Sequence, residues 1–171
     1  GASFDVIDSK GNVVDKLTTN ENGVSIAVLP FGKYTIHQTS GNEGYVFSDD
    51  ITLELYEEKI YEVEIKNLKL SKLEFTKTDF SSGEPLPNTL IEIYKDDDTL
   101  IYKGRTDKNG KIEVPNLEIG KYYILEKEAP KYYRLNTEKM FFEVTENGKI
   151  IKANMKNERK EGNLEFTKTD A

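Results

Sequence analysis

The chain of 171 residues contains no cysteine, so neither disulfides nor thiolate chemistry can stabilise it or supply a nucleophile. It has no apolar run approaching the roughly 20 residues of a membrane span, and no signal peptide opens it. The chain has 24 basic and 31 acidic residues, and its net charge of −7 argues against nucleic-acid binding. No catalytic triad, phosphate loop or metal-ligand cluster is visible. From the sequence we therefore expect neither an enzyme that turns over a substrate nor a cofactor or metal site. We also expect no contact with a membrane or a nucleic acid.

Short alternating runs and turn signals dominate the chain, and no stretch has helical periodicity. Pairs such as Asn22-Gly23 and Asn109-Gly110 tolerate positive φ and suit hairpin turns. The spacing predicts an all-β fold of tandem antiparallel β-sandwiches. The predicted strands are Phe4 to Ile7, Val24 to Val28, Lys33 to His37, Ile60 to Ile65, Leu90 to Tyr94, Tyr122 to Leu125, Met140 to Val144 and Ile150 to Met155.

The two halves of the chain align with each other by their turns and closing strands. In this alignment the first half has no counterpart of residues 72–87, and the last residues repeat an opening strand. We therefore expect three parts: residues 1–69, a domain lacking its first strand; residues 70–160, a complete domain; and residues 161–171, the first strand of a following repeat. The abrupt start suggests a piece of a longer protein, whose targeting and anchoring signals lie outside this window.

The opening strand is marked by the sequence Leu-Glu-Phe-Thr-Lys-Thr-Asp, which occurs at 73–79 and again at 164–170. Side chains alternate along a strand, so Leu73, Phe75 and Lys77 share one face. An unpaired charge in that apolar stripe costs several kcal/mol. Lys77 therefore needs a partner or a reaction.

Two further polar residues continue apolar stripes in the same half. Glu126 follows Tyr122 and Ile124 on one face, and Asn157 follows Met155 on the last strand. Each of the three polar residues, taken alone, fits a solvated position just past the edge of the core. Their coincidence in one domain favours a shared chemical role.

That role is amide formation between Lys77 Nζ and the side-chain carbonyl of Asn157, with release of ammonia. Only a neutral amine is nucleophilic, and desolvation lowers a lysine pKa from its usual value of about 10.4. The same site favours the neutral acid form of Glu126, which can stabilise the oxyanion and relay protons to the leaving amine. Fixed proximity supplies much of the remaining acceleration. The reaction is an autocatalytic, single-turnover crosslink.

The chain resembles the collagen-adhesin B-type (Cna-B, SpaA-like) repeats of Gram-positive surface adhesins and pilins. Three motifs carry the resemblance: Phe75-Thr76-Lys77-Thr78-Asp79, the segment from Tyr123 to Tyr133 that is similar to the family's glutamate box, and Met155-Lys156-Asn157. One departure is Tyr132, which stands where the box usually has glycine.

The resemblance implies a prealbumin-like, inverse immunoglobulin-type sandwich and rod-like stalks of tandem domains. It also implies an intramolecular isopeptide bond from the first-strand lysine to the last-strand asparagine, assisted by the box glutamate. Those roles fall on Lys77, Asn157 and Glu126.

The first half departs more seriously from the family pattern. Gln38 stands where Glu126 stands, and an amide cannot shuttle protons as a carboxylic acid does. Asn67 keeps the acceptor position, but the lysine strand is absent, so we expect no internal bond there. A threonine–glutamine ester bond, as in related adhesin domains, is the alternative, although those domains differ in length and motif.

The predicted function is a structural stalk or spacer of a cell-wall-anchored bacterial surface adhesin, outside the cell, whose partners are neighbouring repeats. The crosslink closes a loop of about 80 residues, which is worth about 4 kcal/mol by analogy with disulfides. The alternative is a ligand-binding adhesin module that recognises a host matrix protein or glycan. Host matrix contact through other parts of the parent protein fits either function.

The two incomplete ends predict head-to-tail self-association. The orphan strand of one molecule can complete the first repeat of the next by strand addition, which places Lys168 near Asn67. Because Gln38 occupies the box, we expect this contact to be non-covalent.

Overall fold

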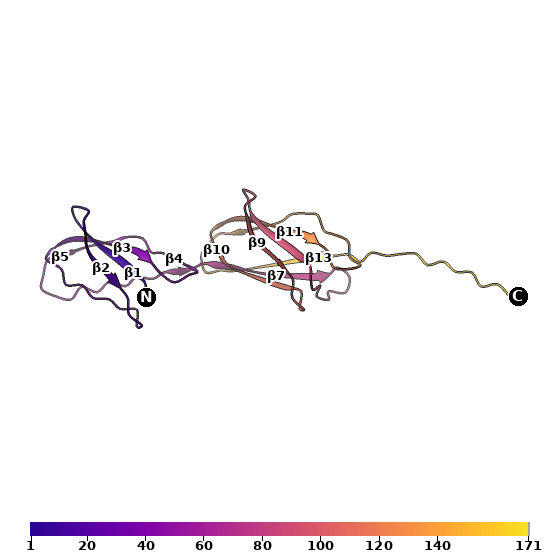
Figure 1. The fold of residues 1–171 in the computed structure, drawn as a ribbon, viewed down its shortest axis with the longest axis horizontal. Helices are drawn as coiled ribbons and strands as arrows, with labels where there is room; N and C mark the ends of the chain where they lie inside the picture. The colour runs from indigo at the N-terminus through magenta and orange to yellow at the C-terminus, as the bar shows by residue number, and fades with distance from the viewer. Residues whose placement is uncertain (171) are drawn as a thin grey trace. The chain divides into compact units, whose positions relative to one another are not determined.

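The computed structural model describes residues 1–170, which form strands, turns and loops without a helix (Figure 1). The chain separates into two compact units, Gly1–Leu70 and Ser71–Ala171. The all-β prediction is confirmed. The strands are β1 (Ser3–Asp8), β2 (Val13–Thr18), β3 (Gly32–Ser40), β4 (Tyr45–Val46), β5 (Ile51–Leu55), β6 (Leu68–Lys69), β7 (Ser71–Asp79), β8 (Leu90–Lys95), β9 (Leu100–Arg105), β10 (Lys111–Leu117), β11 (Gly120–Glu128), β12 (Met140–Val144) and β13 (Ile150–Asn157).

The second unit is a sandwich of two sheets. One sheet has the order β10-β7-β13 and the other β12-β11-β8-β9. Inward-facing side chains of both sheets form one hydrophobic core, as alternation along amphipathic strands requires. Its fully buried members include Leu73, Phe75, Ile91, Ile93 and Ile124.

Strand β7 is the central strand of its sheet. It pairs antiparallel with β10 and parallel with β13, so the first and last strands of the unit lie side by side. Alternate residues of β7 are buried from Ser71 to Asp79, which confirms that Leu73, Phe75 and Lys77 share one face. In the parallel register Lys77 is opposite Met155, and Asp79 is opposite Asn157. This pairing brings the ends of a long stretch of chain together.

The first unit has a single four-stranded sheet, β2-β1-β3-β5, and a small β4-β6 pair. This order matches β9-β8-β11-β12 of the second unit, strand for strand. The opposite sheet does not form among residues 1–70. Three hydrophobic side chains are buried in this unit, namely Phe4, Val6 and Tyr34, against thirteen in the described part of the second unit.

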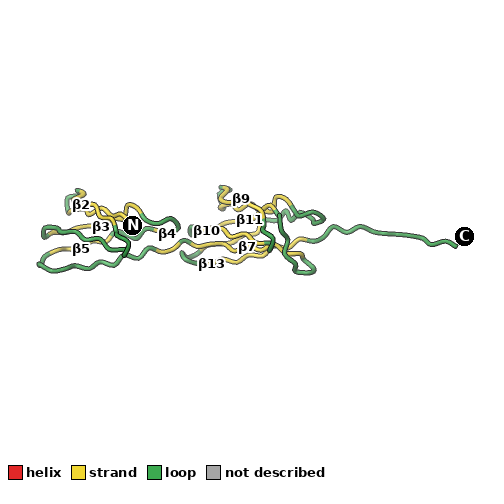
Figure 2. Tube along the Cα trace, turned by 60° about the horizontal axis from the view of Figure 1, so that its bottom comes forward, coloured by secondary structure: helices red, strands yellow, loops and turns green. Residues whose placement is uncertain are grey.

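The prediction of strands is wrong for two segments, Val24 to Val28 and Ile60 to Ile65. Both segments are loops, drawn in green in Figure 2. They correspond to β10 and β13, which in the second unit pair with the central strand β7 and not with each other. No segment of residues 1–70 occupies that central position. Without it, neither flanking segment has a partner for its backbone hydrogen bonds.

Residues 161–170 are exposed and form no strand. The assignment of residues 161–171 as the first strand of a following repeat stays a prediction. The last residue of that segment, Ala171, lies outside the described residues. Among the described residues there is also no helix long and apolar enough to cross a membrane.

Candidate functional site

The structure brings Lys77, Glu126 and Asn157 together at one end of the core of the second unit. Lys77 Nζ donates a hydrogen bond to Asn157 Oδ1 over 2.6 Å. Asn157 Nδ2 donates to Glu126 Oε1 over 2.6 Å. Lys77 Nζ lies 3.4 Å from Glu126 Oε2. The three side chains, carried by β7, β11 and β13, therefore form a closed triangle.

All three polar side chains are buried. The exposed fractions of Lys77, Glu126 and Asn157 are 0%, 3% and 2%, which excludes a solvated position beyond the core edge. Desolvation lowers the pKa of Lys77 to about 8, against the opposing charge and hydrogen bond of Glu126. The lowered pKa makes the neutral, nucleophilic form of this amine more accessible at pH 7 than that of an ordinary lysine.

The carboxyl group of Glu126 is fixed between the two nitrogens. Oε1 faces the amide nitrogen of Asn157, and Oε2 faces Lys77 Nζ. Oε2 also accepts the backbone N–H of Asn136, over 2.8 Å. One oxygen is thus directed at the nitrogen that would attack and the other at the nitrogen that would leave. This placement suits a proton relay.

A second polar cluster, which sequence reasoning missed, surrounds the buried side chain of Asp79. Asp79 Oδ2 accepts hydrogen bonds from Tyr133 Oη and Arg159 Nε, each over 2.7 Å. Asp79 Oδ1 accepts the backbone N–H groups of Ser81 and Ser82. These contacts, led by the Ser82 hydrogen bond and followed by the Arg159 bond, hold the pKa of Asp79 far below its usual value. The sequence could have predicted that Asp79 is buried, because it lies two residues after Lys77 and therefore on the same face of β7.

The turn after β11 contains a residue in the left-handed region. Tyr132 has φ 72°, whereas Gly44, the corresponding residue of the first unit, has φ 84°. A glycine adopts this conformation without a Cβ clash, and a tyrosine adopts it only with strain. The turn therefore has the same left-handed conformation as the turn of the first unit, although it lacks a glycine.

In the first unit Gln38 and Asn67 occupy the positions of Glu126 and Asn157. Gln38 is 4% exposed; its Nε2 donates to Ser40 O, and its Oε1 accepts from Ser48 N. Asn67 Oδ1 is buried and accepts no hydrogen bond among the described residues. The lysine expected nearby, Lys168, is exposed in the C-terminal segment.

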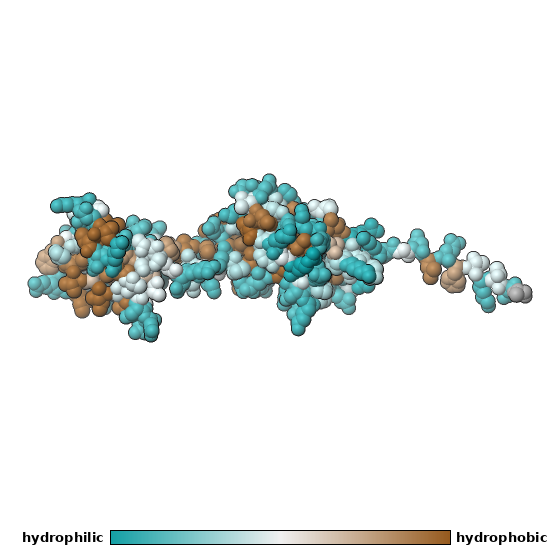
Figure 3. All heavy atoms as spheres, viewed as in Figure 1, coloured by the Kyte–Doolittle hydropathy of each residue, from teal (hydrophilic) through white to brown (hydrophobic). Residues whose placement is uncertain are grey.

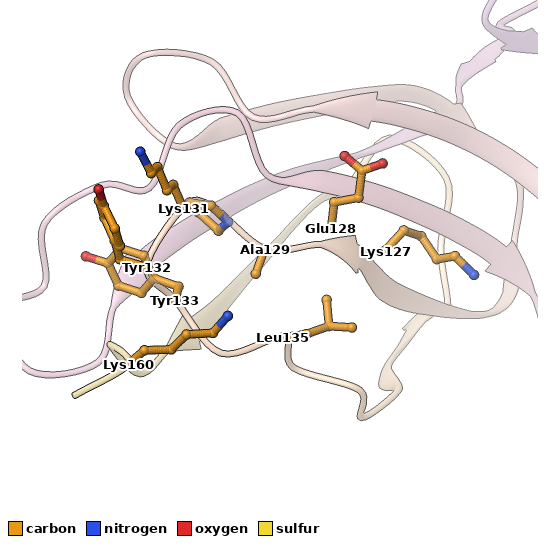
Figure 4. Close-up of a pocket in the computed structure, with 9 residues that line it drawn as sticks. Lys127, Glu128, Ala129, Lys131, Tyr132, Tyr133, Leu135 and Lys160 are labelled. Atoms are coloured by element: carbon orange, nitrogen blue, oxygen red, sulfur yellow. The ribbon is translucent and has the colours of Figure 1, made fainter. Parts of the chain in front are cut away.

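A hollow lies beside the turn after β11, and its lining includes none of the three residues of the buried triangle. Tyr132 and Tyr133 lie together at one end, and Lys127 and Glu128 lie at the other (Figure 4). The remaining lining residues are Ala129, Pro130, Lys131, Leu135 and Lys160. The described residues contain no group of three or more histidine, cysteine or acidic side chains arranged to hold a metal ion.

The second unit is thus a two-sheet β-sandwich whose first and last strands pair in parallel. The family model described as "SpaA: Prealbumin-like fold domain" matches residues 1–69 and 71–159. The chain belongs to this family of SpaA domains, as the resemblance implied.

Solved structures include several proteins similar to this chain. The Bacillus anthracis TIE protein is 32% identical with a TM-score of 0.55, over 93% of this chain and 31% of its own. This chain therefore spans less than a third of that relative. The D295N mutant of the shaft pilin SpaA from Lactobacillus rhamnosus GG is 18% identical to this chain, with a TM-score of 0.59. The match covers 96% of this chain and 95% of the pilin, so the two share the fold. A search of curated proteins returned no match.

Proposed function

We propose that the second unit crosslinks itself through an isopeptide bond between Lys77 Nζ and Asn157 Cγ, with Glu126 as the proton relay. The observation that carries the proposal is the buried triangle. Its short contacts present the amine to the amide carbonyl and the carboxyl group to both nitrogens. Three buried polar groups with no solvent contact are costly to retain unless they react or pair fully.

The reaction starts with transfer of a proton from the Lys77 ammonium to the Glu126 carboxylate, which are 3.4 Å apart. The neutral amine attacks Asn157 Cγ, and negative charge develops on Oδ1. The Glu126 acid group donates a proton toward the leaving nitrogen and recovers one from the attacking nitrogen. The Cγ–Nδ2 bond then breaks, ammonia leaves, and a neutral secondary amide remains. The buried charge on Lys77 disappears in the product.

We further propose that the chain is a structural stalk segment of a bacterial surface adhesin or pilus, located outside the cell. Membership of the SpaA family and the fold shared with a shaft pilin support this assignment. The crosslink joins residues 80 positions apart. A pulling force along the chain would bypass the enclosed segment, which corresponds to about 270 Å of extended chain. Neighbouring domains of the same protein are the partners that a stalk requires.

The mass of the intact chain under denaturing conditions tests the crosslink. We expect the wild-type chain to be lighter than its sequence by one ammonia, and Lys77→Ala and Glu126→Gln to have the full sequence mass. Lys168→Ala is the matched control, because Lys168 lies in the same seven-residue sequence but is exposed. It should keep the deficit. A wild-type chain of full mass would refute the crosslink.

Single-molecule pulling tests the mechanical role separately. The wild-type second unit should release none of the enclosed length, whereas Lys77→Ala should release about 270 Å when it unfolds. Equal extension in both chains would show that the wild-type unit carries no crosslink under load and would overturn the mechanical role.

One observation favours the alternative function, a ligand-binding adhesin module. The hollow of Figure 4 combines exposed tyrosine and lysine side chains, and Tyr132 is 68% exposed. Tyrosine is enriched at protein–protein binding surfaces. Binding of matrix proteins or glycans that is lost in Tyr132→Ser but kept in Lys77→Ala would support this function.

A further inference from the structure

The three side chains of the buried triangle come from both sheets of the second unit. Lys77 and Asn157 lie on β7 and β13, which are neighbours in one sheet, whereas Glu126 lies on β11 in the other sheet. The β7–β13 ladder therefore holds the amine against the amide. Among the described residues no ladder joins β11 to either of these strands. The position of the Glu126 carboxyl group must depend on contacts outside the ladders.

The segment that follows β11 makes such a contact. The backbone N–H of Asn136 donates a hydrogen bond to Glu126 Oε2 over 2.8 Å. The same oxygen lies 3.4 Å from Lys77 Nζ. Because a carboxylate oxygen accepts along preferred directions, a donor fixed on Oε2 sets the orientation of the whole carboxyl group. The path of this segment therefore controls how the proposed proton relay faces the amine.

This segment is paired with the chain that continues from β13. Tyr133 and Arg159 form an isolated antiparallel bridge. Beside this bridge the backbone N–H of Arg134 donates to Glu158 O over 2.9 Å. The backbone contacts join the segment to the strand that carries the acceptor amide, but they do not join it to β7.

Asp79 provides the connection to β7. It is the last residue of that strand, two residues after Lys77, and it is 2% exposed. Its Oδ2 accepts hydrogen bonds from Tyr133 Oη and Arg159 Nε, each over 2.7 Å. Its Oδ1 accepts two backbone N–H groups of the turn after β7. One buried carboxylate thus links the strand of the amine to the segment that orients Glu126.

The cluster reaches from the buried triangle to the surface. The side chain of Arg159 is 58% exposed, whereas that of Asp79 is 2% exposed. Most of the surface of the second unit that Figure 3 shows is hydrophilic, which suits a charged group that ends in water. Hydrogen bonds between charged groups are stronger than neutral ones. Loss of the Asp79 charge would weaken its bonds to Tyr133 and Arg159 and leave the backbone pairing in place.

We propose that Asp79 is a positioning residue for the crosslink, and that it acts through Tyr133 and the Asn136 N–H on the carboxyl group of Glu126. The inference rests on the proposed function. Asp79 has no hydrogen bond to any of the three side chains of the triangle among the described residues. Its carboxylate instead holds the segment after β11 against β7, where the Asn136 N–H meets Oε2. A misplacement of about 1 Å can slow such a reaction about 100-fold.

The rate of ammonia loss after synthesis tests this role. Full chains made by cell-free translation are quenched at intervals in denaturing acid, and the intact mass gives the fraction that has lost one ammonia. We expect Asp79→Asn to slow the loss by about 10- to 100-fold and Tyr133→Phe to slow it less. Both variants should still reach the full deficit. The double variant should be little slower than Asp79→Asn alone, because both changes remove the same contact.

Val144→Ala is the matched control for a loss of stability. Val144 is 1% exposed in the same core. It pairs with Gly120, at the opposite end of β11 from Glu126. The substitution therefore weakens the unit without a change in the cluster, and it should crosslink at the wild-type rate.

Hydrogen exchange of the Asn136 amide gives a readout that does not need the reaction. In Lys77→Met, which has no amine to react, the addition of Asp79→Asn should make this amide exchange at least about 10-fold faster, because the segment after β11 is released. The amides of the β7–β13 ladder should keep their protection. A merely structural effect would raise exchange in the ladder as well.

The outcomes separate this role from the crosslink itself. Ammonia loss at the wild-type rate in Asp79→Asn would overturn the positioning role, and so would an equal slowing in Val144→Ala. Unchanged exchange at Asn136, or faster exchange throughout the ladder, would also overturn it. A wild-type chain that never loses ammonia would refute the crosslink, and the role of Asp79 in it, whereas a wild-type deficit with equal rates would refute the role alone.

Discussion

Replacing Lys77 by methionine separates the effect of the proposed crosslink from the cost of a buried charge. Methionine has a similar length, fills the space beside Phe75 and Met155, and carries no charge to bury. Asn157 keeps its hydrogen bond to Glu126. If the proposed crosslink forms, the substitution removes a covalent loop whose ends are 80 positions apart.

The magnitude follows from the entropy of closing that loop. A crosslink over about 80 residues restricts the unfolded chain by about 4 to 5 kcal/mol on the scale used for disulfides. For a unit of 60–100 residues each kcal/mol shifts the unfolding midpoint by roughly 4–8 °C. We therefore expect the second unit of Lys77→Met to unfold about 20 °C or more below that of the wild type.

Differential scanning calorimetry measures the shift, and denaturing mass spectrometry of the same samples shows which chains are crosslinked. Lys168→Met is the control, because it makes the same substitution in the exposed copy of the sequence. It should leave the midpoint of the second unit unchanged. A Lys77→Met chain of full mass that unfolds at the wild-type temperature would refute the argument that the crosslink stabilises the unit through its unfolded state.

Three further predictions concern other residues of the second unit. Tyr132→Gly should raise the free energy of unfolding by about 1 kcal/mol in urea titrations, because it relieves the strain at φ 72°; a destabilised variant would show that the ring contributes more than the strain costs. Asp79→Asn should lower it by about 2 kcal/mol at pH 7, through the loss of charged hydrogen bonds to Arg159 and Tyr133. The depressed pKa of Asp79 also means that its contribution is complete above the unfolded-state pKa of about 4 and is lost as pH falls further, so wild-type stability should decline more steeply in acid than that of Asp79→Asn; parallel acid titrations would contradict this.

Much of the second unit was predictable because its information is local. Alternation alone placed Leu73, Phe75 and Lys77 on one face, and the same argument placed Glu126 on the same face as Ile124. The repeated sequence also predicted that residues 1–69 contain no counterpart of β7. These inferences need only the two-residue period of a strand and the cost of burying polar groups.

The prediction of strands at Val24 to Val28 and Ile60 to Ile65 failed for a physical reason. A strand is stable through hydrogen bonds to its neighbours, and pattern alone does not show whether a neighbour is present. The Asp79 cluster was missed because Tyr133 lies in the turn after β11 and Arg159 lies just after β13. The side-chain alternation of a strand cannot predict that residues from such distant segments meet.

The sequence by itself determined the all-β class, the repeat, the faces of the strands and the three polar residues that continue apolar stripes. Only the tertiary structure decided that β7 and β13 pair in parallel, which sets Lys77 Nζ 2.6 Å from Asn157 Oδ1. It also decided which segments remain without partners and that Tyr132 adopts a left-handed turn. The difference is physical: burial preference and side-chain alternation are properties of a local segment, whereas strand pairing and proximity across 80 residues depend on how the whole unit closes around its core.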